Sequence, residues 1–243
     1  MSAGKRRGDA PAEQIERLVE GRLRDPHSLL GGHPQDGGTV VRAWRPEAQT
    51  VQVRVDGEVA AKLERIHPAG LFEGVVEGTL EDYEVEVGYA DGKTFTMRDP
   101  YSFLPTLGEL DLHLAGEGSH RRLYEKLGAH PRVERGIDGV AFAVWAPNAR
   151  SVRVVGDFNS WDGRLNPMRT LGSSGIWELF VPGIGAGVLY QYEVVSAQGD
   201  IVLKADPYAF ATEPPPKHAC LVYESGYEWN DAEWIEARAT KDS

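Results

Sequence analysis

The sequence predicts an all-β protein made of two tandem immunoglobulin-like β-sandwiches, with a short N-terminal helix and a helical connector. Two observations support this fold class. Apolar and polar residues alternate through many short segments, such as 51–56 and 83–89, as is typical of strands with one buried and one solvent-facing side. The pattern of the first half also recurs in the second half, which indicates two copies of one domain.

The internal repeat is visible residue by residue. Trp-Arg-Pro-Glu-Ala at 44–48 has its counterpart in Trp-Ala-Pro-Asn-Ala at 145–149. Two further segments recur in the same order and at nearly the same spacing. These pairs are 83–87 with 190–194 and 99–103 with 206–210. One such match could arise by chance, but three in the same order predict a duplicated domain.

The repeat and the segments around it divide the chain into five parts. They are an N-terminal helix and turn segment at 1–38, a first sandwich at 39–110, a connector at 111–137, a second sandwich at 138–225 and a tail at 226–243. Short strands bounded by Gly, Pro and Asp in both repeated parts favour sandwiches over a barrel surrounded by helices.

Helices are expected outside the repeated parts. The first is predicted from apolar residues that share one helical face, namely Ile15, Leu18, Val19 and Leu23. Asp9 is a candidate cap for it, and it is expected to end near Arg24, because Asp25 precedes a proline. In the connector, a second short helix is predicted between Ser119 as cap and Gly128 as stop.

Two further local predictions concern a turn and the tail. Asp91-Gly92 separates two alternating segments, which predicts a type I′ hairpin turn. The tail is predicted to form a helix capped by Asn230 or Asp231, and Trp229 and Trp234 are expected to pack at a junction with a further domain.

Charge and composition narrow the class of partner. The 26 Lys and Arg residues face 37 Asp and Glu residues, which gives a net charge of −11. Such an acidic chain is expected to bind neither nucleic acid nor an anionic membrane. Cys220 is the single cysteine, so no intrachain disulfide is possible. The basic N-terminus is not followed by an apolar run, and no stretch is long enough to span a bilayer, so we expect a soluble, cytoplasmic protein.

Two motifs carry a family resemblance. Asp-Pro-His-Ser-Leu-Leu-Gly-Gly-His-Pro occupies 25–34, and Phe-Ala-Val-Trp-Ala-Pro-Asn-Ala at 142–149 is followed by Val-Val-Gly-Asp-Phe-Asn-Ser-Trp-Asp-Gly at 154–163. Together they resemble the N-terminal region of bacterial 1,4-α-glucan branching enzymes of the glycogen pathway. In that family a sandwich precedes a family-48 carbohydrate-binding module, and a catalytic (β/α)8 barrel follows. The resemblance extends from about residue 25 to about residue 236.

The resemblance implies a region that binds and positions an α-1,4-glucan for a catalytic barrel, supplied in cis or in trans. A purely structural alternative is that the sandwiches brace that barrel and bind no sugar. The family's retaining chemistry uses an Asp nucleophile and a Glu acid/base in the barrel. No Gly-x-Arg-x-Asp run occurs here, so no catalytic residue is expected in this chain. The seven histidines lack the spacing of a helical metal site, so neither a metal nor another cofactor is expected.

The candidate sugar contacts lie in the second sandwich. Trp161 follows Asn159 and precedes Asp162 in a polar turn, so its indole is expected near the surface, with the two flanking residues bonding sugar hydroxyls. In better-binding modules of the family, a Lys and a second Trp stand where this chain has Gln191 and about Ile201, which implies weak binding. The remaining strand tryptophans are expected in the core: Trp44, Trp145 and Trp177.

Overall fold

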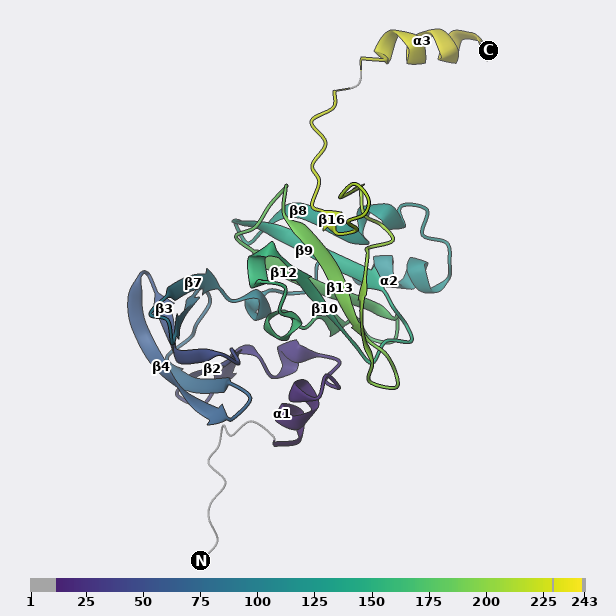
Figure 1. Cartoon of the computed structure of the whole chain (residues 1–243). Coiled ribbons are helices and arrows are strands. Elements are labelled where there is room, and N and C mark those ends of the chain that lie inside the picture. The colour runs from purple at the N-terminus through teal and green to yellow at the C-terminus, as the bar shows by residue number, and fades with distance from the viewer. Residues whose placement is uncertain (1–11, 229, 242–243) are drawn as a thin grey trace, which may run out of the picture.

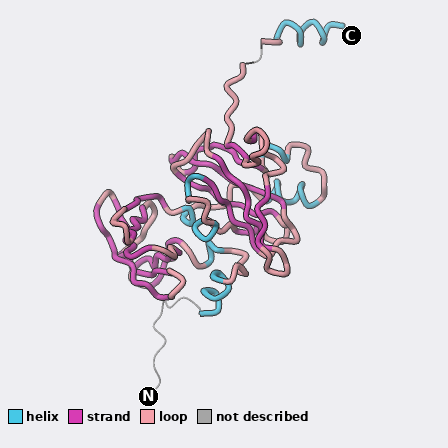
Figure 2. Tube along the Cα trace, in the orientation of Figure 1, coloured by secondary structure: helices cyan, strands magenta, loops and turns pink. Residues whose placement is uncertain are grey.

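The computed structural model describes residues 12–228 and 230–241. Its described part is all-β, as the sequence predicts: strands form almost all of two adjacent domains, whereas the helices are short (Figures 1 and 2). The first domain contains β1 to β7, and the second contains β8 to β16. The segment from Asp9 back to the N-terminus lies outside the described residues, so the expected cap at Asp9 is not described.

The first domain is one antiparallel sheet that folds over itself. Its strands are β1 (Gly31–Gln35), β2 (Gly38–Trp44), β3 (Ala48–Val55), β4 (Glu58–His67), β5 (Leu71–Glu77), β6 (Glu84–Tyr89) and β7 (Thr94–Arg98), in the order β1-β2-β5-β4-β3-β6-β7. The first part of β4 pairs with β3 and its last part pairs with β5. The alternating apolar residues of the two halves therefore share one core, which includes Val41, Val53 and Phe72.

The second domain has two facing sheets. Its strands are β8 (Gly128–Glu134), β9 (Ile137–Trp145), β10 (Ser151–Gly156), β11 (Arg169–Thr170), β12 (Ile176–Pro182), β13 (Leu189–Val195), β14 (Ile201–Lys204), β15 (Ala211–Thr212) and β16 (Cys220–Leu221). One sheet has the order β11-β12-β9-β8, and the other has the order β10-β13-β16-β15 with β14 also paired to β13. Fully buried Phe142 and Trp177 from the first sheet and Tyr190 from the second belong to one core.

The repeat is reproduced in buried side-chain contacts. The Tyr83 hydroxyl donates to Asp99 Oδ2 at 2.7 Å, and the Tyr190 hydroxyl donates to Asp206 Oδ2 at the same distance. In both domains the aspartate also accepts a hydrogen bond from the backbone amide two residues further on. Each domain thus contains the same tyrosine–aspartate pair, which closes a turn after a core strand.

A fourth repeated segment marks the first strand of each domain. Leu-Gly-Gly-His-Pro at 30–34 corresponds to Leu-Gly-Ala-His-Pro at 127–131, and these segments lead into β1 and β8. Gly31 and Gly128 have φ angles of +91° and +109°, which favour glycine, and each lies against the backbone of a tyrosine. Both strands belong to sheets, although they precede the expected sandwich starts at 39 and 138.

The expected helices differ from the observed ones in length and position. Helix α1 spans Ala12–Val19 and ends before Gly21, whose φ is +61°, so it does not reach Arg24. The connector holds α2 (Glu109–Gly116), which was not predicted, and the helix expected after Ser119 is a single 3₁₀ turn, η3 (Leu123–Glu125). Pairing of β8 with β9 begins at Gly128, which leaves too few residues for a longer helix. Helix α3 (Ala232–Lys241) agrees with the predicted tail helix.

The hairpin turn at Asp91-Gly92 also differs in type. Of the two residues only Gly92 has a positive φ, whereas a type I′ turn requires a positive φ at both central residues. The Tyr89 amide donates to the carbonyl of Lys93, so the loop has three residues with glycine in the left-handed position. The Asp91 carboxylate accepts from the Lys93 amide and stabilises the turn.

The two domains are held together by polar and apolar contacts. Helix α1 packs into a core that contains residues of both domains, and the Arg24 guanidinium lies 5.5 Å from the centre of the Trp177 ring. The Tyr101 hydroxyl donates to the carbonyl of Pro167 at 3.2 Å. Arg169, which pairs with the fully buried Glu178 of its own sheet, donates from Nη1 to the carbonyl of Phe103 at 3.2 Å. These contacts fix the domains in one arrangement.

The strand tryptophans were expected in the core, and the expectation is wrong for one of them. Trp44 and Trp177 are buried, but Trp145 is 60% exposed. Trp44 and Trp145 are equivalent in the repeat, and each indole donates to a backbone carbonyl in the turn that precedes the paired strand β5 or β12, at Ala69 and Ser174 respectively. Trp44 belongs to the buried cluster that residues of both domains share, whereas Trp145 does not.

Candidate functional site

The candidate sugar-binding residues occupy the loop that follows β10. Two 3₁₀ turns shape this loop, η4 (Asp157–Asn159) and η5 (Gly163–Leu165). The loop starts at Gly156, where a Cβ atom would lie 2.3 Å from the carbonyl oxygen of Leu189. Glycine is therefore required for the close approach of this loop to β13.

Asn159 supports the loop from inside. Its Oδ1 accepts from the Gly156 amide, and its Nδ2 donates to the Val154 carbonyl and to Asn166 Oδ1, each at 2.9 Å. The side chain is only 5% exposed, so its hydrogen-bonding groups face the protein. The expected contact between Asn159 and a sugar hydroxyl is therefore not available, and this residue positions the loop instead.

Trp161 is the side chain that the loop presents. Ser160 and Trp161 have φ angles of +53° and +61°, a region that non-glycine residues rarely adopt and that is most unusual for a bulky one. The Trp161 amide donates to the Gly156 carbonyl at 3.0 Å, and its indole Nε1 donates to Asp157 Oδ1 at 3.2 Å. The ring is 38% exposed, as the sequence predicts for a residue near the surface. Strain of this kind is typical of functional loops.

Asp162 and Gln191 are both engaged within the protein. Asp162 accepts from the Arg164 amide at 3.0 Å and from its guanidinium at 2.7 Å. Partial burial opposes ionisation, but these hydrogen bonds hold the pKa of Asp162 below its usual value, so the carboxylate stays charged. Gln191 is buried on β13, where its amide faces the carbonyl of His218 at 3.5 Å. Ile201, by contrast, is exposed on β14. Of the four candidates, Trp161 is the most exposed, the Asp162 side chain is partly exposed, and Asn159 and Gln191 are buried.

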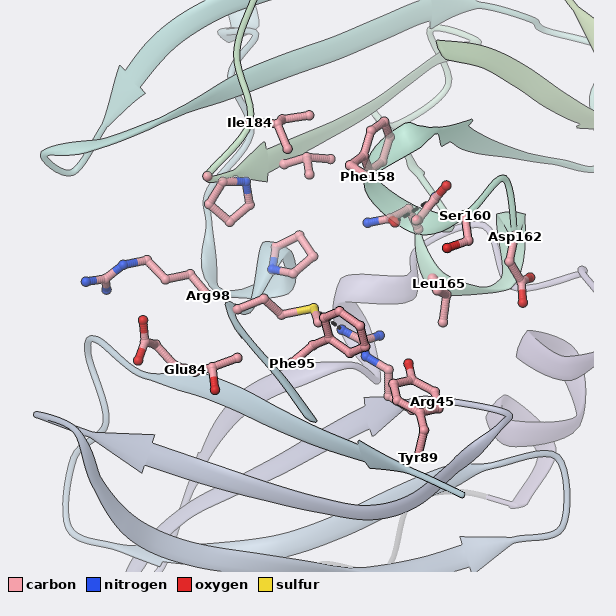
Figure 3. A pocket seen from close by; sticks show the side chains of 18 of the residues that line it. Arg45, Glu84, Tyr89, Phe95, Arg98, Phe158, Ser160, Asp162, Leu165 and Ile184 are labelled. Carbon is pink, nitrogen blue, oxygen red and sulfur yellow. Dashed lines mark hydrogen bonds between the residues drawn. The ribbon is translucent and has the colours of Figure 1, made fainter. Parts of the chain in front are cut away.

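The other side of the loop faces a cleft that the sequence did not indicate. Ser160, Asp162 and Leu165 line this cleft between the domains, but Trp161 does not (Figure 3). Arg45, Tyr89 and Phe95 of the first domain form its opposite wall. Sequence patterns could not reveal the cleft because its walls come from segments that only the packing of the domains brings together.

The described residues offer little for other chemistry. They contain no group of three or more His, Cys, Asp or Glu side chains placed to hold a metal ion. Burial raises the pKa of Asp206 in the second domain, and this carboxyl group accepts from Tyr190 and Tyr192 inside the core. None of the helices within the described ranges is both long and apolar enough to cross a membrane.

Comparison with protein families divides the chain in the same way as the structure. Residues 11–101 match the model of the alpha-1,4-glucan branching enzyme GlgB N-terminal domain, and residues 126–209 match carbohydrate-binding module 48, also described as the isoamylase N-terminal domain. The chain has the domain pair of the N-terminal region of branching enzymes. The resemblance stated from the two motifs is thus confirmed.

Curated relatives share this region at high identity. The 1,4-alpha-glucan branching enzyme GlgB of Frankia casuarinae is 52% identical over 95% of this chain, which covers 29% of that enzyme. The enzyme of the same name from Myxococcus xanthus is 51% identical over 94% of this chain, which covers 32% of it. The chain therefore spans about a third of the length of the relatives that it matches.

Proposed function

We propose that this chain is a non-catalytic region that binds and positions an α-1,4-glucan for a branching reaction. In that reaction α-1,4 links are broken and re-formed as α-1,6 branches by a catalytic barrel, in cis or in trans. The observation that carries the proposal is the exposed, rigidly held indole of Trp161 on a carbohydrate-binding module 48. The identity with branching enzymes supports the choice of glucan and a cytoplasmic setting.

The chemistry of a pyranose suits such a platform. A glucose ring has C–H groups on its faces and hydroxyls at its rim, so a flat indole can cover one face while the hydroxyls remain in water. Covering some tens of Å² contributes about 1–2 kcal/mol. Asn159, Asp162 and Gln191 make their hydrogen bonds within the protein, so the ring contributes most of the binding. We expect weak binding that increases with the length of the glucan.

Affinity electrophoresis in an amylopectin gel tests the proposal. The unchanged chain should be retarded, and Trp161→Ala should be retarded clearly less. Trp145→Ala is a matched control, because it removes another exposed indole away from the loop and should leave retardation unchanged. Retardation that Trp161→Ala leaves unchanged would show that the glucan site does not include Trp161.

A second candidate function is docking to the catalytic barrel without any sugar contact. It is favoured by the uncovered apolar surface of the second domain. Trp145 is exposed although its counterpart Trp44 is buried in the cluster shared by both domains, and Ile201, Val202 and Leu203 are exposed along β14. If docking is the main role, Trp145→Ala should weaken association with a separately produced branching-enzyme barrel, and Trp161→Ala should change neither association nor gel mobility.

A further inference from the structure

The cleft between the two domains encloses about 1070 Å³, at the upper end of the roughly 300–1,000 Å³ of ligand pockets (Figure 3). On the first domain its wall is the β6–β7 hairpin together with the turn after β2. On the second domain its wall is the loop of 157–166 and the turn that follows β12. Two repeated domains thus enclose one shared binding-sized space.

Both walls carry apolar groups suited to the faces of sugar rings. On the hairpin, the rings of Tyr89 and Phe95 meet edge to face, with centroids 5.9 Å apart, and Phe95 is 51% exposed. Met97 lies two residues after Phe95 on β7, and therefore on the same face of the strand. Across the cleft, Phe158 and Ile184 provide the facing apolar surface (Figure 3).

Polar groups that lack partners also line the cleft. The Arg45 side chain is buried: its Nη1 donates to the Trp44 carbonyl at 2.8 Å, its Nη2 lies 3.6 Å from the sulfur of Met97, and its Nε has no partner but is not accessible to a ligand. Within the part of the chain that the structure describes, the carboxylates of Glu84 and Asp138 take no hydrogen bond or ion pair in the cleft wall. Two carboxylates that can accept hydrogen bonds, placed beside apolar groups, match a ligand rich in hydroxyls.

The charge of the cleft favours a neutral ligand. Lys93 pairs with Asp91 at 2.9 Å, and Arg98 pairs with Asp82, so neither cation is available for an anion. The acidic residues of the lining outnumber the basic ones: Glu47, Glu84, Asp91, Asp138 and Asp162 face Arg45, Lys93 and Arg98. Phosphorylated or carboxylated ligands would therefore be repelled.

We propose that this inter-domain cleft is a second oligosaccharide site, which binds a short α-1,4-glucan segment between the Tyr89–Phe95 pair and the Phe158–Ile184 surface. The choice of an α-1,4-glucan as ligand rests on the proposed function, whereas the presence of a binding site is inferred from the shape and lining of the cleft. Trp161 does not line the cleft, but its neighbours Ser160 and Asp162 do. The loop therefore presents one surface to each site, and the two sites are separate.

Methionine NMR provides a test in which the titrated chain has no substitution. The sequence contains three methionines; Met97 lines the cleft and Met168 is buried in the core. In a chain labelled with ¹³C-methyl methionine, maltoheptaose should shift the Met97 signal and leave that of Met168 in place, with Met97→Leu used for assignment. A Met97 signal that does not move at saturating maltoheptaose would overturn the proposal.

Calorimetric titration with maltoheptaose separates the two sites. In a Trp161→Ala background, Phe95→Ala should weaken the remaining binding by about fivefold or more, because it removes one apolar face. Phe210→Ala is the matched control, since Phe210 is 52% exposed and also makes one edge-to-face ring contact, at 5.6 Å, but lies outside the cleft.

The outcomes distinguish this proposal from the proposed function. If Trp161→Ala removes all binding and Phe95→Ala has no effect in the unchanged chain, the cleft site is refuted while the Trp161 site stands. If Phe95→Ala and Phe210→Ala weaken binding equally, the loss is not specific to the cleft and the proposal fails. If the unchanged chain binds no maltoheptaose, both proposals fail.

Discussion

Asn159 gives the sharpest contrast between an interpretation from sequence and one from structure. As a sugar contact, its removal would lower glucan affinity without affecting the fold. In the structure its side chain makes three hydrogen bonds of 2.9 Å and is almost fully buried. Asn159→Ala would leave the Gly156 amide, the Val154 carbonyl and the Asn166 side chain without these partners.

The expected destabilisation follows from those contacts. Each lost hydrogen bond costs about 1 kcal/mol in free energy of unfolding, so Asn159→Ala should cost about 3 kcal/mol. For a chain of this size, that corresponds to a melting temperature lower by about 6–12 °C. The left-handed conformations of Ser160 and Trp161 each cost about 1–3 kcal/mol, so without Asn159 the loop should also relax and release the indole from its position.

Differential scanning calorimetry and amylopectin gel retardation measure the two consequences together. Asn159→Ala should lower both the melting temperature and the retardation, whereas Trp161→Ala should lower retardation alone. Asn148→Ala is the control for the substitution itself, because Asn148 is exposed in the turn after β9. An Asn159→Ala variant that melts like the unchanged chain but no longer binds glucan would refute the supporting role and restore the direct sugar contact.

Three further predictions concern the core and its ionisation. Trp177→Ala should cost about 3–5 kcal/mol in urea unfolding because the indole is fully buried, whereas Trp145→Ala should change stability by no more than about 0.5–1 kcal/mol. Tyr190→Phe should cost about 1–3 kcal/mol because it removes a hydrogen bond from buried Asp206. Burial, with lesser effects of nearby positive charge, holds the pKa of His27 well below 6.5 in the folded state. As pH falls below about 6.5, the unfolded chain binds a proton at His27 and the folded chain does not, so the free energy of unfolding should fall by up to about 1.4 kcal/mol per pH unit.

Exposed residues of the same types serve as controls. Tyr124→Phe should leave unfolding unchanged, and an equal loss for Tyr124→Phe and Tyr190→Phe would contradict the role of the buried pair. Around His27, the charged or titratable groups are Asp25, with a carboxylate oxygen 4.0 Å from Nδ1, and Arg169 and His33. His27→Phe should make the free energy of unfolding less dependent on pH between 6.5 and 5. The same substitution at exposed His113 should leave that dependence unchanged, and identical slopes for the two variants would contradict the role of buried His27.

The sequence by itself determined the fold class and the duplication. Alternation of apolar and polar residues is a local property of a strand, and it identified both domains before any contact was known. The repeated tyrosine and aspartate positions were visible in the same way, and the structure shows them paired in both copies. Trp161 was also accessible to sequence reasoning, because a tryptophan in a polar turn has little around it that could bury it.

Only the tertiary structure decided which polar residues remain available and which surfaces are covered. Asn159 and Gln191 look suited to sugar hydroxyls, yet the Asn159 amide bonds to Val154 and Asn166 within its own loop and strand, and the Gln191 amide bonds to the carbonyl of His218. Trp44 and Trp145 occupy equivalent positions, but only Trp44 lies in the buried cluster formed by residues from α1 and both domains. The cleft likewise exists because two hairpins and loops far apart in the chain meet across the domain boundary. Such properties depend on packing between segments, and local residue patterns do not encode them.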